Sequence, residues 1–369
     1  MIQLHQPFIQ ERNYGCRIEQ WGTYKGMRTI VMQNEFIRLS LLLDKGTDIY
    51  ELLYKPLDID FLWRSPQGIR HPNDIPSISN PEGVFADVYP GGWQEVFPSG
   101  SGPSVYRGAW LGFHGEVAVS PWEYEIMINR PDFIEVKLTT RTLRTPFILE
   151  KKIAISARES MFTIDEQVLN YGKTDLHYMW GHHPSFGGPF LSEDCILNLP
   201  PCTVFTHPQK TGEKMRFLPR QQFQWPEGLD ADGNVVDLRQ IPGKNLAAAD
   251  MLYAADYTEG WFALTNLQKG VGIGMVWDVS DYPYMWIWQE FGGTLEHPWY
   301  GNAYTLAVEP FTSLPGKGEH GLQESIANGT AALLRAGSVV RKKLKVVIYE
   351  SKHPVKRIAL NGQVERDHA

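Results

Sequence analysis

Apolar and polar residues alternate with a period of two in several segments of the chain. In FIEVKLTTRTL (133–143), Ile134, Val136 and Leu138 share one face of an extended strand, while polar residues occupy the other. Stretches with a helical period are scarce, and the best candidate is GLQESIANGTAALLRAG, around residue 325. The pattern predicts an all-β protein with few short helices. The other predicted strands are IRLSLLL (37–43), MFTIDEQVLNY (161–171), GVGIGMVWDV (270–279) and VVRKKLKVVIYE (339–350).

Segments rich in Pro and Gly separate the predicted strands. We expect long loops at 65–83, 90–103 and 207–219, and loops of this length commonly carry function. The chain shows no internal repeat and no linker. We therefore predict one domain over residues 1–369 that consists of two packed antiparallel sheets. Its core covers about 20–350, and the tail 351–369 adds one short strand.

The net charge and the cysteine content indicate which binding partners and which cellular compartment to expect. The net charge of −7 comes without a basic stripe, so nucleic acid is not an expected partner. The sequence shows no signal-like start and no apolar run near twenty residues, so we expect a cytoplasmic protein without a membrane partner. Cys16, Cys195 and Cys202 form no C-x-x-C pair and are expected to be buried, inert thiols. We expect a monomer or a homodimer.

Aromatic residues are abundant, with 12 Trp, 16 Tyr and 17 Phe. Aromatic faces beside polar groups suit the apolar faces of sugar rings, although such residues also fill ordinary cores. Four stretches place ionisable residues among aromatics, Gly and Pro: 91–100, 111–124, 177–188 and 304–316. We expect a functional site where these stretches meet.

Residues 180–188, WGHHPSFGG, contain two adjacent histidines. If residues 176–183 are extended, Trp180 and His182 share one face, while His177 and His183 share the other. The two neighbouring imidazoles should therefore point in opposite directions. At most one of them then belongs to a given site.

Two further ionisable residues stand in apolar or Gly-rich contexts. Glu309 lies within the apolar strand TLAVEPFTS, where desolvation should raise the pKa of its carboxyl toward the range useful for proton transfer. His114 precedes Gly115, which allows a close backbone approach. A structural role, such as a solvent-facing strand end or a hydrogen-bonding histidine, is the common alternative for each.

Two other chemistries remain open at this stage. A metal could be held by His177, His183 and Glu309, although no H-x-H, H-E-x-x-H or cysteine cluster supports it, and we predict no metal and no cofactor. Glycoside hydrolysis needs a second carboxylate beside Glu309, and the sequence singles out none.

The order of three motifs, H-G, then H-P-x-F, then V-E-P-F-T-S, resembles the galactose mutarotase (aldose 1-epimerase) superfamily over most of the chain. The segment NEFIRLSLLLDKGTDIYELLY is similar to its opening strands, and GWQEVFPSG looks like a divergent branch. The resemblance implies a β supersandwich with a sugar lying across one open sheet face. It also implies an isomerase that interconverts α and β anomers of a cyclic aldose by acid/base ring opening, without metal or redox cofactor.

The resemblance assigns roles to individual residues. His183, in the H-P-x-F stretch, matches the family's general acid, and Glu309 on the late strand matches its general base. His114 matches a second histidine that contacts substrate. The protonated form of His183 would need support from a neighbouring carboxylate or acceptor. The other expected sugar contacts are Trp93, Gln94, Trp286 and Trp288.

The chain departs from the family at positions that contact sugar hydroxyls. The N-R pair after the F-P motif is absent, Q-x-Y-T has become W-I-W-Q, and the sugar-binding Asp has only loose counterparts in Asp278 and Asp281. The substrate is therefore left open. The alternatives are a non-catalytic carbohydrate-binding protein of the same fold, or an epimerase of an acidic or phosphorylated sugar. The last would need a cation such as Arg107, Arg141 or Arg144.

Overall fold

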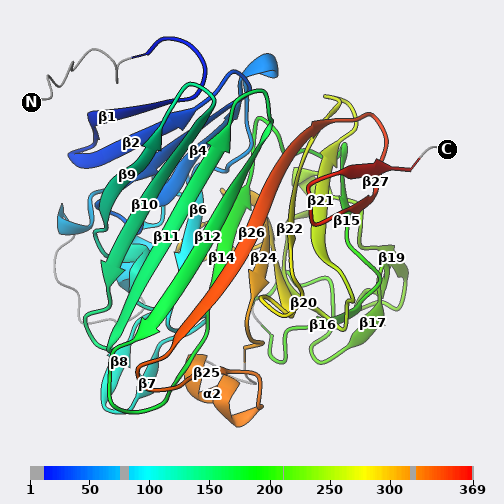
Figure 1. Cartoon of the computed structure of the whole chain (residues 1–369). Coiled ribbons are helices and arrows are strands. Elements are labelled where there is room, and N and C mark those ends of the chain that lie inside the picture. Colours follow the sequence, from blue (N-terminus) through cyan, green and yellow to red (C-terminus); the bar gives the residue numbers. More distant parts are fainter. Residues whose placement is uncertain (1–11, 75–82, 211, 316–320, 368–369) are drawn as a thin grey trace, which may run out of the picture.

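Two large antiparallel sheets pack face to face in the computed structural model (Figure 1). The structure describes residues 12–74, 83–210, 212–315 and 321–367. Every strand pair within the two large sheets is antiparallel, so the predicted all-β sandwich is confirmed.

The larger sheet has twelve strands. Its central strands, which come from three distant parts of the sequence, carry most of the candidate residues. The order is β1 (Arg17–Tyr24), β2 (Met27–Gln33), β3 (Ile37–Leu42), β4 (Asp48–Tyr54), β6 (Trp93–Val96), β14 (Gly181–Phe186), β24 (Tyr304–Phe311), β23 (Tyr284–Phe291), β20 (Ala248–Ala255), β16 (Thr203–Thr206) and β17 (Gln222–Gln224), with β5 (Ile59–Asp60) beside β4.

The smaller sheet has eight strands and lies in front of the larger one in Figure 1. Its order is β15 (Cys195–Asn198), β21 (Gly260–Asn266), β22 (Val271–Trp277), β26 (Val339–Glu350), β12 (Met161–Asn170), β11 (Phe147–Ser156), β10 (Phe133–Arg141) and β9 (Glu123–Asn129). The four small hairpins are β7 (Ser104–Tyr106) with β8 (Ala109–Leu111), β13 (Leu176–Tyr178) with β25 (Ala332–Leu334), β18 (Glu227–Leu229) with β19 (Val235–Asp237), and β27 (Val355–Ile358) with β28 (Val364–Arg366).

Helices are few and short, as predicted. The described residues form α1 (Gly83–Val88) and α2 (Gly321–Ala327), with single 3₁₀ turns at Lys55–Leu57, Pro72–Asp74, Val117–Val119 and Lys244–Leu246. No helix among the described residues has the length and apolarity needed to cross a membrane.

The five segments with the clearest strand patterns are strands in the structure, as β3, β10, β12, β22 and β26. Two other predictions need correction. The segment 90–103, expected as a loop, contains the central strand β6, whose four residues are all buried and therefore show no alternation. The helix near residue 325 ends at Ala327, because Gly329 takes a left-handed φ of 77° and the chain continues into β25.

The residues after β26 form one strand more than expected. Strands β27 and β28 make a hairpin that packs against the smaller sheet, where Val355 and Ile358 join Trp261 and Val347 in a small apolar cluster. This part of the predicted tail 351–369 is therefore an ordered element rather than a frayed end. Residues 368–369 lie outside the described range.

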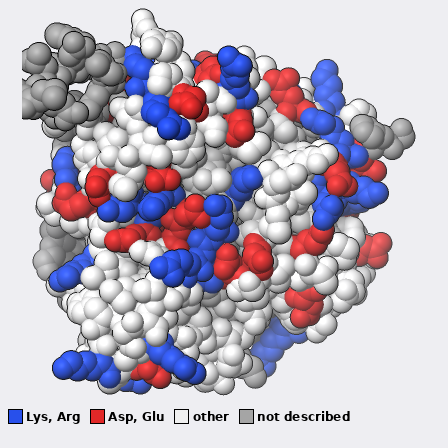
Figure 2. All heavy atoms as spheres, in the orientation of Figure 1, with Lys and Arg blue, Asp and Glu red and all other residues white. Residues whose placement is uncertain are grey.

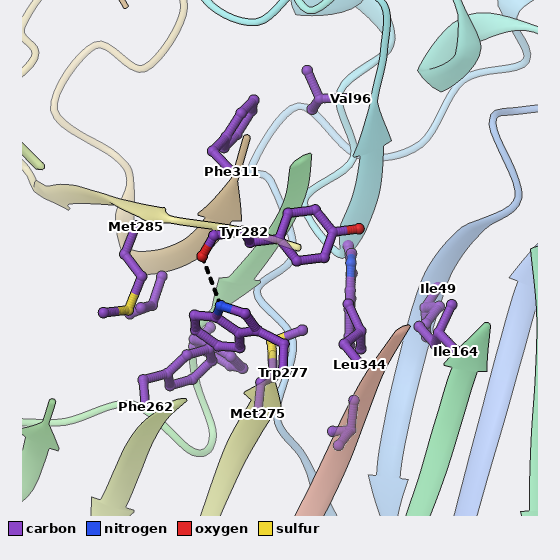
Figure 3. Close-up of a cluster of buried hydrophobic side chains, with 14 of the residues drawn as sticks. Ile49, Val96, Ile164, Phe262, Met275, Trp277, Tyr282, Met285, Phe311 and Leu344 are labelled. Atoms are coloured by element: carbon purple, nitrogen blue, oxygen red, sulfur yellow. Dashed lines mark hydrogen bonds between the residues drawn. The ribbon is translucent and has the colours of Figure 1, made fainter. Parts of the chain in front are cut away.

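The apolar core lies between the two sheets. Figure 3 shows side chains from both sheets meeting there, among them Ile49 from the larger sheet and Ile164 and Leu344 from the smaller one. The Trp277 indole donates a hydrogen bond of 2.8 Å to the Tyr282 carbonyl, the dashed line in Figure 3. This bond satisfies a buried polar group at the edge of the core.

The outer face of the smaller sheet carries charges of both signs, as Figure 2 shows. Ion pairs join neighbouring strands there, such as Lys343 Nζ with Asp165 at 3.0 Å and Lys137 Nζ with Glu125 at 2.5 Å. Positive and negative groups alternate instead of forming a basic stripe. This face therefore lacks the feature that a nucleic acid would require.

A buried polar cluster interrupts the apolar core directly behind the centre of the larger sheet. Lys151, Glu166 and Lys342 are cross-strand neighbours on the inner face of the smaller sheet. From the larger sheet, Glu95 accepts a hydrogen bond of 2.9 Å from the Lys151 ammonium, and the His182 Nε2 lies 2.9 Å from the Glu166 carboxylate. These contacts tie the two sheets together.

Aromatic donors complete this cluster. Trp180 donates to the Glu95 carboxylate at 3.0 Å, and Tyr282 donates to the Glu166 carboxylate at 3.1 Å. Burial alone would raise the pKa of Glu166, but His182 and the other hydrogen-bonding and cationic neighbours hold it below its usual value. The lowered pKa means that this carboxylate stabilises the fold at neutral pH and loses that contribution as the pH falls through it.

We predict that His182→Ala lowers the free energy of unfolding by about 3 to 5 kcal/mol at pH 7, because it leaves the buried Glu166 carboxylate without its imidazole partner. Urea denaturation measures the change. His183→Ala, which removes a buried imidazole from the opposite face, is the matched control and should cost less. Equal losses for the two variants would contradict this role of His182.

Candidate active site

Four candidate residues form a row across neighbouring strands of the larger sheet, on the face away from the smaller sheet. Gln94 on β6 pairs with His183 on β14, and Trp286 on β23 pairs with Glu309 on β24. The register between β14 and β24 places His183 beside Glu309. Paired residues of neighbouring strands project from the same face. The topology therefore brings together residues that are more than two hundred positions apart.

His183 and Glu309 face each other directly. The His183 Nε2 lies 3.7 Å from the Glu309 Oε1, which is too long for a hydrogen bond. The Ser185 Oγ lies 3.1 Å from the His183 Nδ1 and fixes the ring. Glu309 is 1% exposed, and its Oε2 has no hydrogen-bond partner among the described residues. A buried carboxylate oxygen without a partner can accept a hydrogen bond from a ligand.

Burial shifts the pKa values of this pair toward the uncharged forms. Desolvation raises the pKa of Glu309 well above its usual value, as the sequence predicted. Desolvation also lowers the pKa of His183 to about 4, and the nearby Lys45 charge acts in the same direction. The expectation that His183 rests in its protonated form is therefore wrong. At neutral pH His183 is therefore uncharged, and the raised pKa of Glu309 favours a proton on its carboxyl.

His114 lies against this pair in a strained conformation. Its backbone φ is +59°, which is uncommon for a residue other than glycine, and strain of this kind is concentrated at functional sites. Its ring centroid is 5.4 Å from that of His183, and its Nδ1 has no partner among the described residues. Burial, and then the His183 charge, hold the pKa of His114 well below its usual value. His114 is thus a neutral imidazole beside His183.

An aromatic cage surrounds the histidine pair. Tyr89 and Trp288 approach the His183 ring with centroid distances of 5.5 and 5.6 Å. Trp63 and Trp299 pack against Trp288 at 6.2 and 6.0 Å. Trp288 is partly buried, whereas Tyr89, Trp63 and Trp299 are buried.

The other two predicted aromatic sugar contacts, Trp93 and Trp286, do not belong to this cage. Trp93 points into the sandwich, where its indole donates to the His182 Nδ1 at 3.2 Å, because it alternates with Gln94 along β6. Its predicted sugar contact is therefore wrong. Trp286 is on the site face beside Glu309 but stacks on Phe311 at 3.8 Å, so one ring face is already covered. It supports the site instead of presenting an open wall.

The two adjacent histidines point in opposite directions, as strand alternation predicts. His182 contacts Glu166 between the sheets, whereas His183 contacts Glu309 on the outer face. The segment is not one continuous strand, since β13 ends at Tyr178 and β14 begins at Gly181. The alternation nevertheless holds across the break.

The donor set of the metal alternative is not assembled. His177 lies on β13, where its ring contacts Tyr106 rather than His183. No group of three His, Cys, Asp or Glu side chains within the described ranges is arranged to hold a metal ion. The loosely placed Asp281 accepts a hydrogen bond from the Lys343 backbone, away from this site.

Three residues near the site escaped the sequence analysis. Tyr89 follows α1, and its hydroxyl lies 2.5 Å from the Ser185 Oγ. Lys45 and Asp48 form a buried ion pair, and Asp48 accepts a hydrogen bond of 2.8 Å from the Gln94 amide. The signal that could have found the last two is a Lys and an Asp flanking Gly-Thr within the apolar run LLLDKGTDIY.

We predict that Glu309→Gln stabilises the protein by about 1 to 2 kcal/mol at pH 7, since strained functional sites are commonly less stable than their substituted forms. A carboxyl with a raised folded pKa costs stability above its unfolded pKa and costs nothing once both states are protonated. Thermal unfolding should therefore show a gain at pH 7 that shrinks as the pH falls toward the ordinary glutamate value and is absent below it. A variant that is less stable at both pH values would contradict the raised pKa.

The sequence matches one family model over residues 24–348, described as "Domain of unknown function (DUF4432)". No curated protein matches the chain.

Solved structures of bacterial proteins share the fold. A candidate aldose 1-epimerase from Klebsiella pneumoniae superposes with a TM-score of 0.66 at 13% identity, covering 91% of this chain and 84% of that one. A galactose mutarotase-like protein from Clostridium acetobutylicum gives 0.60 at 13% identity, with 91% and 99% covered. A galactose mutarotase related enzyme from Lactobacillus acidophilus gives 0.58 at 14%, with 88% and 98% covered. Identities this low establish the fold alone. The chain belongs to the DUF4432 family and has the galactose mutarotase-like fold.

Proposed function

We propose that this protein is an aldose 1-epimerase-type isomerase, which interconverts the α and β anomers of a cyclic aldose. The observation that carries the proposal is the contact between His183 and Glu309, 3.7 Å apart within a buried aromatic cage. An acid and a base at this separation suffice for ring opening. The similar solved structures support the assignment of the fold.

The chemistry fits two groups on one face of the sheet. Ring opening removes the proton from O1 and delivers a proton to the ring oxygen, and both oxygens are bonded to C1. Side chains on neighbouring strands can therefore reach both atoms, without standing on opposite sides of the sugar. After rotation about C1–C2, the ring closes on the other carbonyl face and each proton returns to its donor.

The directions of the two pKa shifts favour one assignment of the roles in the free protein. With the proton on Glu309, this carboxyl is the acid for the ring oxygen, and neutral His183 is the base for O1. These roles are the reverse of those implied by the family resemblance. Either arrangement uses the same single proton, so the reaction needs no other donor.

The proposal competes with two alternatives. A carbohydrate-binding protein without turnover would have no use for an acid/base pair whose pKa values are this strongly perturbed. An epimerase of an acidic or phosphorylated sugar would need a cation in the site. Arg107, Arg141 and Arg144, suggested for that purpose by the sequence, are exposed and lie outside the cage.

We also propose a cytoplasmic protein that acts as a monomer or homodimer and needs no cofactor, membrane or nucleic acid. Its cysteines are free, buried thiols, and burial raises the pKa of each one. Such thiols are unreactive and suit a reducing compartment.

We predict that the protein accelerates anomer exchange of at least one aldose, and that His183→Ala and Glu309→Gln each lower kcat/KM by about 10² to 10⁴. Exchange NMR on freshly dissolved α-anomers measures the rate across a panel of neutral and acidic sugars. Asp250→Asn, a change at a buried carboxylate outside the site, is the control and should leave the rate nearly unchanged. A sugar that binds without any acceleration would leave only the binding function.

We predict an acid limb of kcat/KM near pH 4. The pair must hold one proton, so activity falls when His183 takes a second, and the pKa of His183 is lowered to about 4. The alkaline limb follows the loss of the Glu309 proton and lies above the usual glutamate value. The imidazole ¹⁵N shifts of His183 should report a neutral ring at pH 7. A charged ring at that pH would refute the assignment.

A further inference from the structure

The row of site residues continues beyond Gln94 to a second polar group. Ile49 on β4 pairs with Trp93 on β6, which places Asp48 beside Gln94 on the site face. The Gln94 Nε2 donates to the Asp48 Oδ2 at 2.8 Å and to the Gly91 carbonyl at 2.7 Å. The Lys45 ammonium donates to the same Asp48 oxygen.

These three side chains are fully buried yet incompletely paired. Lys45, Asp48 and Gln94 are each 0% exposed. The Asp48 Oδ1 and the Gln94 Oε1 have no partner among the described residues. Asp48 is the one described residue to which the Lys45 ammonium donates, although an ammonium carries three donors. Buried polar atoms are rarely left unpaired, and each such exception needs a physical reason.

The same group is coupled to the catalytic pair. The Lys45 charge contributes to the lowered pKa of His183, after burial. Glu309 and Asp48 both raise the pKa of Tyr89, which burial already holds well above its usual value. Tyr89 thus lies within electrostatic reach of both carboxyls.

We infer that Lys45, Asp48 and Gln94 form a subsite that binds two neighbouring hydroxyl groups of an uncharged sugar held over His183 and Glu309. A hydroxyl group both donates and accepts hydrogen bonds. One hydroxyl can donate to the Asp48 Oδ1 while it accepts from the Lys45 ammonium. The next hydroxyl can donate to the Gln94 Oε1, which belongs to a side chain already bonded to Asp48.

Charge decides against an anionic sugar at this subsite. The Lys45 ammonium is already paired with Asp48, and His183, whose pKa is lowered to about 4, supplies no positive charge at neutral pH. A carboxylate or phosphate placed here would be buried beside Asp48 without a countercharge of its own, which is strongly unfavourable. A neutral diol satisfies the unpaired atoms and adds no charge.

This inference rests on the proposed site, and two readouts test it separately from the proposed reaction. Saturation-transfer NMR titrations of the full chain measure the binding of neutral aldoses, their monodeoxy analogues and the matching uronates. Exchange NMR on the same samples measures anomer interconversion. For the sugar that binds best, removal of either of two neighbouring hydroxyls should weaken binding about 10- to 100-fold. The uronate should bind more weakly than the neutral parent.

Variants assign the hydroxyls to residues. Asp48→Asn and Gln94→Leu should each weaken binding of the parent sugar about tenfold or more. Neither should weaken binding of the deoxy analogue that lacks the hydroxyl in question. Asp250→Asn is the matched control, because Asp250 is also a buried carboxylate paired with a cation, Arg216, but lies outside the site. It should bind the parent sugar like the wild type.

The outcomes separate the two proposals. If deoxy sugars bind as well as their parents, or the uronate binds best, the subsite is refuted, and anomer exchange in the same samples still supports the reaction. If the hydroxyl pattern holds without exchange, the reaction is refuted and the subsite stands. If no sugar binds the wild type, the subsite is refuted as well. If Asp48→Asn fails to fold, Gln94→Leu, which removes no charge, decides the question alone.

Discussion

The hydrogen bond between His182 and Glu166 connects the two sheets directly behind the candidate site. It joins β14, in the middle of the larger sheet, to β12 of the smaller one, within a cluster that also contains Lys151 and Glu95. Buried polar contacts of this kind require one geometry, whereas apolar packing tolerates small shifts. Because strand alternation is rigid, fixing His182 on one face fixes His183 on the other. The position of the catalytic histidine therefore depends on a contact made on the opposite side of its own strand.

The buried polar side-chain atoms on the two sides of β14 differ in how completely they are hydrogen-bonded. Behind the strand, the contacts of His182 and Glu95 pair most of the polar atoms of the interior cluster. In front of it, Asp48, Gln94, His114 and Glu309 each keep an unpaired buried atom, which makes four of the eleven such side-chain atoms found among the described residues. Buried polar atoms without a hydrogen-bond partner lower the stability of the fold. Their concentration on one face is therefore typical of a ligand-binding site.

How far the sequence predicts the structure depends on whether a segment has two different faces. Strands β10 and β12 alternate buried and half-exposed residues along their length, so their period was visible. Strand β6 is buried on both faces and was read as a loop, and Trp93 was consequently assigned to the sugar instead of to His182. The opposite directions of His182 and His183 followed from alternation alone, whereas the proximity of His183 to Glu309 required the order of strands in the sheet. Lys45 and Asp48 are near each other in sequence, but their place beside the site depends on Gln94, which is 46 residues from Asp48.

The protonation of the pair could not be read from local sequence for a related reason. An apolar strand context was enough to predict that the pKa of Glu309 is raised. The low pKa of His183 depends on burial beneath Tyr89, His114 and Trp288, which approach from three separate parts of the chain. The same burial that makes the imidazole neutral raises the pKa of the carboxyl, so the loss of a proton from His183 is opposed by the retention of one on Glu309. A closed, apolar cage is therefore compatible with acid/base chemistry at neutral pH, provided that both groups share the same cage.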